Sequence, residues 1–210
     1  MVHPRAGAER WLTCRSIRRQ ALHGPRGSSI LFSMAGNELG RDMTGKVLIA
    51  YTTRKGSTEE IARAIAAELE AMGNTVTVAD MKGIPSIAGY QAVVIGTPIY
   101  LAQVEKAVPA FVARNHDGIL KVPVAAFVVG IAPVNPKVGS VEEVLGKLRA
   151  ALDPVKPVAV TMFAGVLELS LMSFVERTLT TLMNVFTGDF RDWEAIRAWA
   201  RELPRVLNLA

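Results

Sequence analysis

Residues 46–58 read KVLIAYTTRKGST, and this stretch decides the fold class. Its first six residues are mostly apolar and β-prone, which indicates a strand buried in a parallel sheet. A polar turn containing Gly56 follows the strand. A helix is then predicted up to a stop signal at Gly73 and Asn74. Its apolar residues recur at helical spacing: Ile61, Ile65, Leu69 and Met72. Strand, tight loop and helix in this order predict the start of a βαβ unit.

The same alternation continues along the chain. Four more strands are predicted, at residues 75–79, 91–96, 124–129 and 158–163. Three further helices are predicted, at residues 103–116, 140–152 and 192–207. Five strands separated by helices predict an α/β fold with a parallel sheet covered on both faces. Ligands of such sheets bind beyond the carboxyl ends of the strands, so the loops 52–58, 96–103 and 130–137 become the candidate site.

Two helix starts carry the spacing of a capping box, in which a Ser or Thr is followed three residues later by Glu. Ser57 and Glu60 form one such pair, and Ser140 and Glu143 form the other. We therefore expect each serine to be the N-cap of its helix.

An apolar segment at about 168–190 does not fit a minimal five-stranded unit. It contains many large apolar residues and, as its only basic residue before 190, Arg177. Three interpretations stay open: a helix packed on the sheet edge, a helix that docks on a partner or membrane surface, and a wall over a hydrophobic substrate. The scarcity of Lys and Arg argues against strong binding to anionic lipid.

Basic residues are concentrated at the N-terminus. The chain of 210 residues has a formal net charge of +5, with 24 Lys and Arg against 19 Asp and Glu. Residues 1–43 hold seven of these Arg and three of the acids, so residues 44–210 are nearly neutral. We therefore predict a basic, disordered leader or mis-assigned start at 1–43, followed by one domain at 44–210. A flexible, non-functional tail, an upstream start whose natural replacement is Met43, an organellar transit peptide, a secretory signal and a nucleic-acid arm remain alternatives for the leader.

Composition narrows the class of protein further. Half of the residues are hydrophobic, which suffices for a packed core. The single cysteine, Cys14, excludes an internal disulfide framework and a multi-cysteine metal site, and no metal is expected. Charge-free stretches are too short for a membrane span. We expect a cytoplasmic protein with at most peripheral membrane contact and no nucleic-acid partner. No Ser-His-Asp or Cys-His arrangement is evident, so no catalytic residue is assigned.

The polar turn after the first strand has the composition of a phosphate site. It offers hydroxyls, a glycine and the free amides of a helix N-terminus, which together favour an anion. Dinucleotide-binding loops of the GxGxxG type are excluded, since no GxG occurs in the chain. A Walker-like run at 40–46 is dismissed because Val47 replaces the magnesium-binding Ser or Thr and a strand follows the run instead of preceding it.

This turn and its flanks resemble the FMN-phosphate loop of flavodoxins, and the resemblance spans about residues 46–207. The TTRKGST turn, VVIGTPIY at 93–100 and the run of Thr187-Gly188-Asp189 into Asp192-Trp193-Glu194 are more similar still to the flavodoxin-like, menaquinone-dependent protoporphyrinogen IX dehydrogenases. The resemblance implies a flavodoxin-like sheet of order 2-1-3-4-5 with helices on both faces. It also implies a helical insertion after the fifth strand and FMN as cofactor.

The same resemblance implies the site residues. The FMN phosphate is expected at Thr52, Thr53, Arg54, Lys55, Gly56, Ser57 and Thr58. The flavin ring is expected beside Thr97, Pro98, Ile99, Tyr100 and Leu101. Its other edge is expected at Gly130, Ile131, Ala132 and Pro133. Tyr100 is the best candidate for stacking because it is the only aromatic residue in its loop, although it could instead cap the sheet. Arg54 and Lys55 either add charge near the phosphate or are solvated.

Two functions follow from the resemblance. The first is an FMN-dependent oxidoreductase of the protoporphyrinogen type, acting in heme biosynthesis, in which flavin passes electrons from an organic donor to a quinone. The second is a flavodoxin-type electron carrier with no substrate chemistry, which docks on a redox partner protein. Carriers usually display an acidic face near the flavin, so Arg54 and Lys55 argue mildly against the second. A flavin-free relative is a third class, which the intact loop argues against.

Overall fold

A computed structural model describes residues 45–135, 138–167 and 187–209 of the chain. The predicted leader at 1–43 lies outside these residues, so its interpretation stays a prediction. Most of the predicted insertion at 168–190 also lies outside them.

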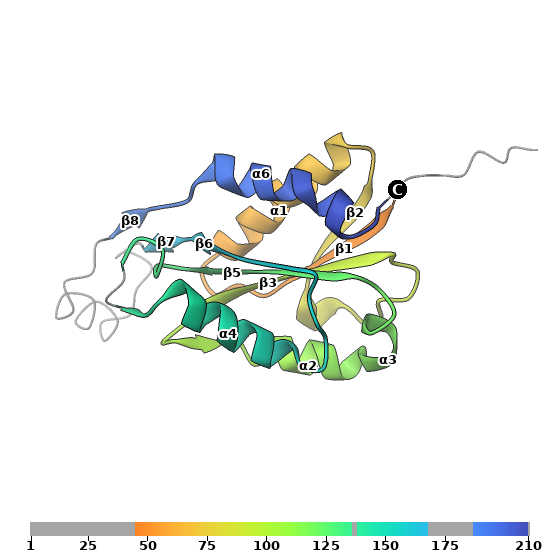
Figure 1. The fold of residues 1–210 in the computed structure, drawn as a ribbon, viewed down its shortest axis with the longest axis horizontal. Coiled ribbons are helices and arrows are strands. Elements are labelled where there is room, and N and C mark those ends of the chain that lie inside the picture. The colour runs from red at the N-terminus through yellow and green to blue at the C-terminus, as the bar shows by residue number, and fades with distance from the viewer. Residues whose placement is uncertain (1–44, 136–137, 168–186, 210) are drawn as a thin grey trace, which may run out of the picture. The chain divides into compact units, whose positions relative to one another are not determined.

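The core of the domain is a parallel sheet of order β2-β1-β3-β5-β6 (Figure 1). Its strands are β1 Lys46–Tyr51, β2 Thr75–Asp80, β3 Ala92–Tyr100, β5 Val124–Gly130 and β6 Ala159–Ala164. Every neighbouring pair along this path is parallel. Counted along the chain these are the first to fifth parallel strands, so the expected order 2-1-3-4-5 is confirmed.

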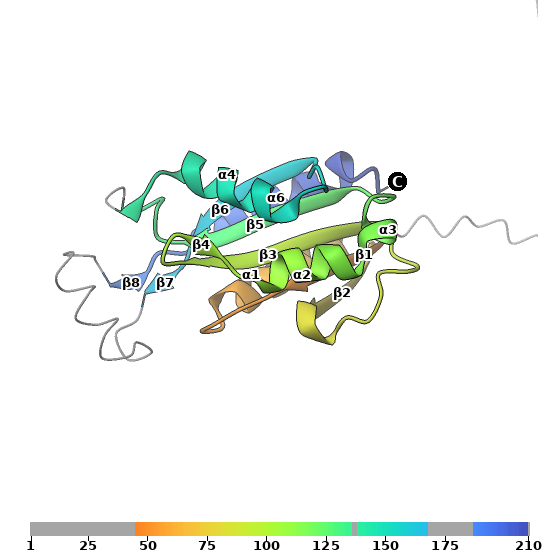
Figure 2. The same cartoon turned by 90° about the horizontal axis from the view of Figure 1, so that it is seen from below.

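Helices cover both faces of the sheet, as Figures 1 and 2 show. One face carries α1 Ser57–Ala71 and α6 Trp193–Val206. The other carries α2 Ala107–Arg114 and α4 Val141–Leu152, with the short α3 His116–Ile119 beside α2. A single 3-10 turn, η1 Met81–Gly83, follows β2. The fold is therefore the doubly wound α/β sandwich that the alternating pattern predicts.

Each layer has its own apolar core because the central strands are buried on both faces. Ile61, Ile65 and Leu69 of α1 are fully buried, in agreement with their helical spacing. Phe127, Phe163 and Trp199 form an aromatic cluster under α6, with ring centres 5.7 to 6.1 Å apart. Trp199 is thus a packing residue.

The structure corrects the end of the third strand. Residues 97–100 were expected in a loop, but β3 continues to Tyr100 because Thr97 and Pro98 stay in register with Val128 and Val129 of β5. The chain then folds back into the short strand β4 Gln103–Val104, which is antiparallel to β3.

The tight turn between β3 and β4 has positive φ angles of 47° at Leu101 and 57° at Ala102. The helix expected at 103–116 therefore begins only at Ala107, and Pro109 lies in its first turn. Local apolar spacing could not reveal this hairpin, because the turn is made by two residues that carry no glycine or asparagine signal.

One of the two expected capping boxes is wrong. The N-cap of α1 is Gly56, and Ser57 is already the first helical residue, with no side-chain cap at this helix start. The cause is the left-handed backbone of Gly56, whose φ of 90° turns the chain one residue earlier than the motif indicates. At α4 the expectation is confirmed, since Ser140 is the N-cap and its Oγ accepts a hydrogen bond of 3.1 Å from the Glu143 amide.

A two-residue ladder brackets the segment between the sheet and the last helix. β7 Val166–Leu167 pairs antiparallel with β8 Gly188–Asp189. Within the described part of the chain, none of the helices has the length and hydropathy needed to cross a membrane.

Candidate functional site

The loop after β1, the end of β3 and the loop after β5 meet at the edge of the sheet where the parallel strands have their carboxyl ends (Figure 1). The loop after β1 is joined to β3 by a hydrogen bond of 2.9 Å from the Thr52 amide to the Gly96 carbonyl. The segment after β6 is joined to β5 by a hydrogen bond of 2.9 Å from the Gly165 amide to the Gly130 carbonyl. The structure therefore gathers the expected residues at the topological switch point, where α/β sheets bind ligands.

The loop after β1 is shaped as an anion cradle. Gly56 has φ 90°, and its amide donates a 3.0 Å hydrogen bond to Oγ1 of Thr53. Helix α1 begins directly after Gly56 without a side-chain cap. The amides of a first helical turn have no partner within the helix, and the helix dipole adds partial positive charge there. The loop can thus hold an anion with backbone amides alone.

Thr58 supplies an independent test of whether a phosphate fits this loop. Its side chain is fully buried in the first turn of α1, and its Oγ1 has no hydrogen-bond partner among the described residues. A buried hydroxyl without a partner is costly, so such a group calls for an explanation. A phosphate held by the loop would provide an acceptor for this hydroxyl, so the residues present fit the phosphate of the expected flavin.

The carboxylates of the first turn are engaged elsewhere. Glu59 pairs with Arg63 at 2.7 Å, and Glu60 pairs with Arg191 at 2.5 Å. Hydrogen bonding to Arg63 holds the pKa of Glu59 below its usual value. Burial raises the pKa of Tyr51, and Glu59 raises it further, so this phenol at the end of β1 stays protonated at neutral pH.

Arg54 does not extend freely into solvent. Its guanidinium pairs with Glu105 and lies over the ring of Tyr100, with Cζ 4.0 Å from the ring centre. The side chain is nevertheless 47% exposed. Arg54 therefore joins the first loop to the end of β3 and to the chain preceding α2.

The remaining expected residues differ in their accessibility. Thr97 is fully buried, with its Oγ1 donating a 3.1 Å hydrogen bond to the Pro98 carbonyl, and Ala132 is also buried. Leu101 is 68% exposed at the tip of the β3–β4 turn, and Pro133 is exposed as well. Leu101 and Pro133 are therefore the residues of this set that are accessible to a ligand at the carboxyl edge of the sheet.

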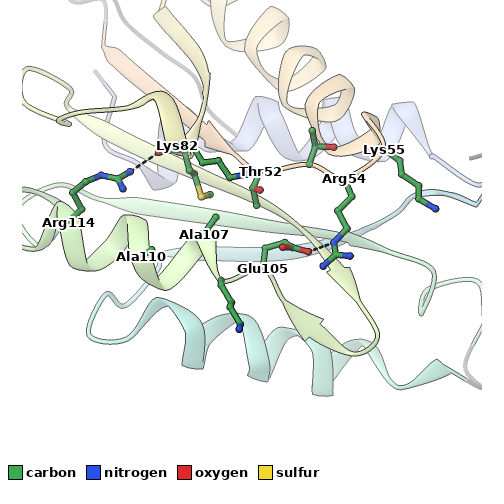
Figure 3. Close-up of a pocket in the computed structure, with 11 residues that line it drawn as sticks. Thr52, Arg54, Lys55, Lys82, Glu105, Ala107, Ala110 and Arg114 are labelled. Atoms are coloured by element: carbon green, nitrogen blue, oxygen red, sulfur yellow. Dashed lines mark hydrogen bonds and ion pairs between the residues drawn. The ribbon is translucent and has the colours of Figure 1, made fainter. Parts of the chain in front are cut away.

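Sequence reasoning missed a pocket on the α2 side of the first loop, with a volume of about 710 Å³ (Figure 3). It adds Lys82 from η1 and Glu105, Lys106 and Arg114 from around α2. Lys82 could have been anticipated, because it follows the carboxyl end of β2 and so belongs to the ligand-binding edge. The residues of α2 gave no such signal.

Arg191 was missed as well. Its side chain is 11% exposed and lies between Asp189 at 2.6 Å and Glu60 at 2.5 Å, with the Trp193 ring centre 4.6 Å away. Hydrogen bonding to Asp189 raises the pKa of Arg191, and the Arg191 guanidinium in turn lowers the pKa of Asp189. This residue ties the chain after β8 to the first turn of α1.

Within residues 45–135, 138–167 and 187–209, no group of three or more His, Cys, Asp or Glu side chains is arranged to hold a metal ion. The arrangement offers an anion cradle, an aromatic ring and basic side chains at one edge.

Comparison with known proteins gives a consistent result. The family model described as "Flavodoxin domain" matches residues 48–193. A curated relative, protoporphyrinogen IX dehydrogenase [quinone] from Escherichia coli, is 26% identical over 175 residues, covering 78% of this chain and 97% of that protein.

Solved structures match the chain at low sequence identity. A mutant flavodoxin from Fusobacterium nucleatum, bound to flavin mononucleotide, is 16% identical with a TM-score of 0.50, covering 78% of this chain and 98% of that one. Rubredoxin oxygen:oxidoreductase from Desulfovibrio gigas is 19% identical with a TM-score of 0.47, and the match covers 80% of this chain. The chain spans only 37% of the length of that protein.

Proposed function

Because this chain belongs to the flavodoxin-domain family, we propose that it is an FMN-dependent oxidoreductase that passes electrons from an organic donor to a quinone. The quinone and the donor are suggested by the relative from Escherichia coli, whose name specifies protoporphyrinogen IX and a quinone. The proposal places the protein in heme biosynthesis and in the cytoplasm, with at most peripheral membrane contact and no nucleic-acid partner. It assigns the activity to residues 44–210 and none of it to the leader at 1–43.

The cofactor of this domain is FMN, and the loop after β1 is the proposed seat of its phosphate. The unpartnered, fully buried Oγ1 of Thr58 carries this assignment, because it lies in the uncapped first turn of α1 immediately after Gly56. Amides of the turn and the hydroxyls of Thr53, Ser57 and Thr58 would bind the phosphate oxygens. Charge-assisted hydrogen bonds of this kind contribute about 1.5–3 kcal/mol each.

The flavin ring is proposed to lie between the end of β3 and the loop after β5. Bound FMN supplies hydride and electron transfer, and the protein supplies position, electrostatics and exclusion of water. Tyr100 would contact the ring, and Leu101 and Pro133 would shield its edges. Gly130 lies at the end of β5, where the side chain of Ile99 fills the space of a Cβ, so only glycine fits there.

The alternative is an electron carrier without substrate chemistry. The surface near the first loop argues against a carrier, because it is basic rather than acidic. Its basic residues are Arg54, Lys55, Lys82 and Lys106. Carriers of the flavodoxin type usually dock through acidic residues near the flavin.

One set of measurements distinguishes these functions. The full chain is purified, its visible spectrum is recorded, and FMN is added to any apoprotein. Under anaerobic conditions the oxidised protein is then mixed with protoporphyrinogen, and the reduced protein with menadione. Turnover in both half-reactions is expected. Protein that takes up no FMN contradicts both redox functions, and rapid exchange with a ferredoxin reductase without turnover in either half-reaction identifies a carrier. The same assays on protein starting at Met43 test whether the leader is dispensable.

A further inference from the structure

A pocket of about 710 Å³ lies between the first loop, η1 and the start of α2 (Figure 3). Small-molecule sites typically enclose about 300–1,000 Å³. A water molecule takes about 30 Å³ of liquid volume, so the pocket is far larger than a single inorganic ion requires. Ala107 and Ala110 form part of the α2 wall, and their short side chains leave this space open.

The pocket is lined by five basic side chains and one carboxylate, that of Glu105. This is unusual for the domain, because residues 44–210 carry 17 basic against 16 acidic residues. The positive excess of the body is therefore gathered around one concave surface. Clefts lined by one sign of charge focus the field and raise the local concentration of the opposite ion.

The basic groups come from separate walls. Arg54 belongs to the first loop, Lys82 to η1 and Lys106 to the N-cap of α2. The ammonium groups of Lys82 and Lys106 have no ion-pair or hydrogen-bond partner among the described residues, and both side chains are exposed. A ligand that neutralises both ammonium groups must therefore carry at least two negative groups, one facing η1 and one facing the start of α2.

The walls are also joined to each other. Nη2 of Arg114 in α2 donates a 2.6 Å hydrogen bond to the Met81 carbonyl in η1. Glu105 is joined to Arg54 of the first loop. The pocket is thus built before any ligand arrives, which lowers the entropic cost of binding.

The pocket adjoins the proposed phosphate cradle and shares a wall with it. Residues 52–55 line the pocket, whereas Gly56, Ser57 and Thr58 do not. Lys82, Lys106 and Arg114 line the pocket as well and are not among the residues assigned to the FMN phosphate.

We propose that this pocket binds a small organic polyanion, carrying two or more carboxylate or phosphate groups, next to the flavin site and independently of it. Carboxylates and phosphates share the chemistry that Lys and Arg recognise. An anion in the pocket competes with the Glu105 carboxylate for Arg54. Glu105 therefore lowers the affinity of the pocket for anions. The inference goes beyond the proposed redox function, since it needs no flavin.

Calorimetric titration of the full chain in the presence of FMN tests the proposal, with citrate as the carboxylate probe and pyrophosphate as the phosphate probe. At least one probe should bind. The K82Q/K106Q double variant should lose at least about tenfold in affinity, because two charge-assisted contacts disappear. Glu105→Gln should bind several times more tightly, because the competing carboxylate is gone. Lys121→Gln is the matched control, as Lys121 is exposed and precedes β5 at the opposite edge of the sheet.

Each outcome has a defined meaning. Binding of citrate alone assigns carboxylates, binding of pyrophosphate alone assigns phosphates, and binding of both supports a general polyanion site. No binding of either probe overturns the proposal, as does unchanged affinity in the double variant or an equal loss in Lys121→Gln. The single variant K82Q replaces the double one if thermal melting shows that the latter is unfolded. If the chain takes up no FMN but binds a probe with the expected loss in K82Q/K106Q, this inference stands while the proposed function fails.

Discussion

Arg54 and Tyr100 are in direct contact across the edge of the sheet, with the guanidinium carbon 4.0 Å from the centre of the ring. Arg54 lies in the loop after β1 and Tyr100 is the last residue of β3, and the sequence predicted separate contacts with FMN for them, at the phosphate and at the ring. Their contact means that the first loop and the end of β3 act as one unit. Glu105, which pairs with the same guanidinium, extends this unit to the start of α2.

Replacing Tyr100 should weaken FMN binding. In Tyr100→Ala the affinity should fall by about 0.5–1.5 kcal/mol, the usual contribution of an aromatic contact, while Tyr100→Phe keeps the ring and most of the affinity. Flavin fluorescence during titration of the apoprotein measures the change. Tyr90→Ala is the control, because Tyr90 also lies under a cation, Lys46, but precedes β3 at the opposite edge. Equal losses in Tyr100→Ala and Tyr90→Ala would contradict a flavin contact.

Two glycines with nearly the same backbone conformation allow an effect on protein stability to be distinguished from an effect on FMN binding. Gly56 and Gly73 have φ angles of 90° and 88°, and an added Cβ meets no close neighbour at either. Each Gly→Ala substitution should lower the free energy of unfolding by about 1–2 kcal/mol, since the left-handed region disfavours a Cβ. Only Gly56→Ala should also lower FMN affinity, because Gly73 is at the far end of α1. Denaturation and flavin titration of both variants check this, and an unchanged affinity in Gly56→Ala would refute the cradle.

Thr58→Val should affect stability and binding in opposite directions. It replaces a buried hydroxyl that has no partner among the described residues, so the apoprotein should be at least as stable as the wild type. FMN affinity should fall by about 1.5–3 kcal/mol, the contribution of one hydrogen bond to a charged phosphate. Thermal melting of the apoprotein and flavin titration give the two values. Thr77→Val, on β2, is the control and should leave FMN affinity unchanged.

Arg191 should contribute more to stability than an exposed arginine with the same number of carboxylate partners. Arg191→Ala leaves Asp189 and Glu60 without their shared partner, and should lower the free energy of unfolding by about 1–2 kcal/mol. Arg201 also joins two carboxylates, Glu68 and Glu194, but it is 49% exposed, so Arg201→Ala should lower the free energy of unfolding clearly less than Arg191→Ala does. Urea denaturation at neutral pH compares the two, and equal effects would argue against a special role for Arg191.

The ion pair of Arg191 and Asp189 also predicts how the stability of the domain depends on pH. Because Arg191 holds the pKa of Asp189 below its ordinary value, the unfolded chain binds this proton more readily than the folded one. The stabilisation is complete above the ordinary pKa of Asp, about 3.9, and is lost as the pH falls through the lowered value. Denaturation between neutral and acidic pH should therefore show a smaller loss of stability in Arg191→Ala than in the wild type. An identical loss in both proteins would show that the Arg191–Asp189 pair does not contribute to the loss of stability in acid.

The first strand, the loop after it and helix α1 could be predicted from the sequence because they rest on local signals, whereas the strand order was implied by the resemblance to flavodoxins. The apolar run before Thr52 and the helical spacing of Ile61, Ile65 and Leu69 lie within one window of the chain. The extension of β3 to Tyr100 could not be predicted, since Thr97 and Pro98 become strand only through their pairing with β5.

The basic pocket was hidden for a related reason. Lys82 and Arg114 are far apart in the sequence, and their shared site exists only once η1 and α2 pack together. Gly56 was misjudged as a loop residue before the cap, because a motif based on residue types cannot register a left-handed φ.

The ladder of β7 and β8 pairs Val166 with Asp189 and Leu167 with Gly188. The pairing therefore holds the chain that leaves β6 beside the chain that enters α6, so the two short strands clasp together two parts of the domain that are distant in the sequence.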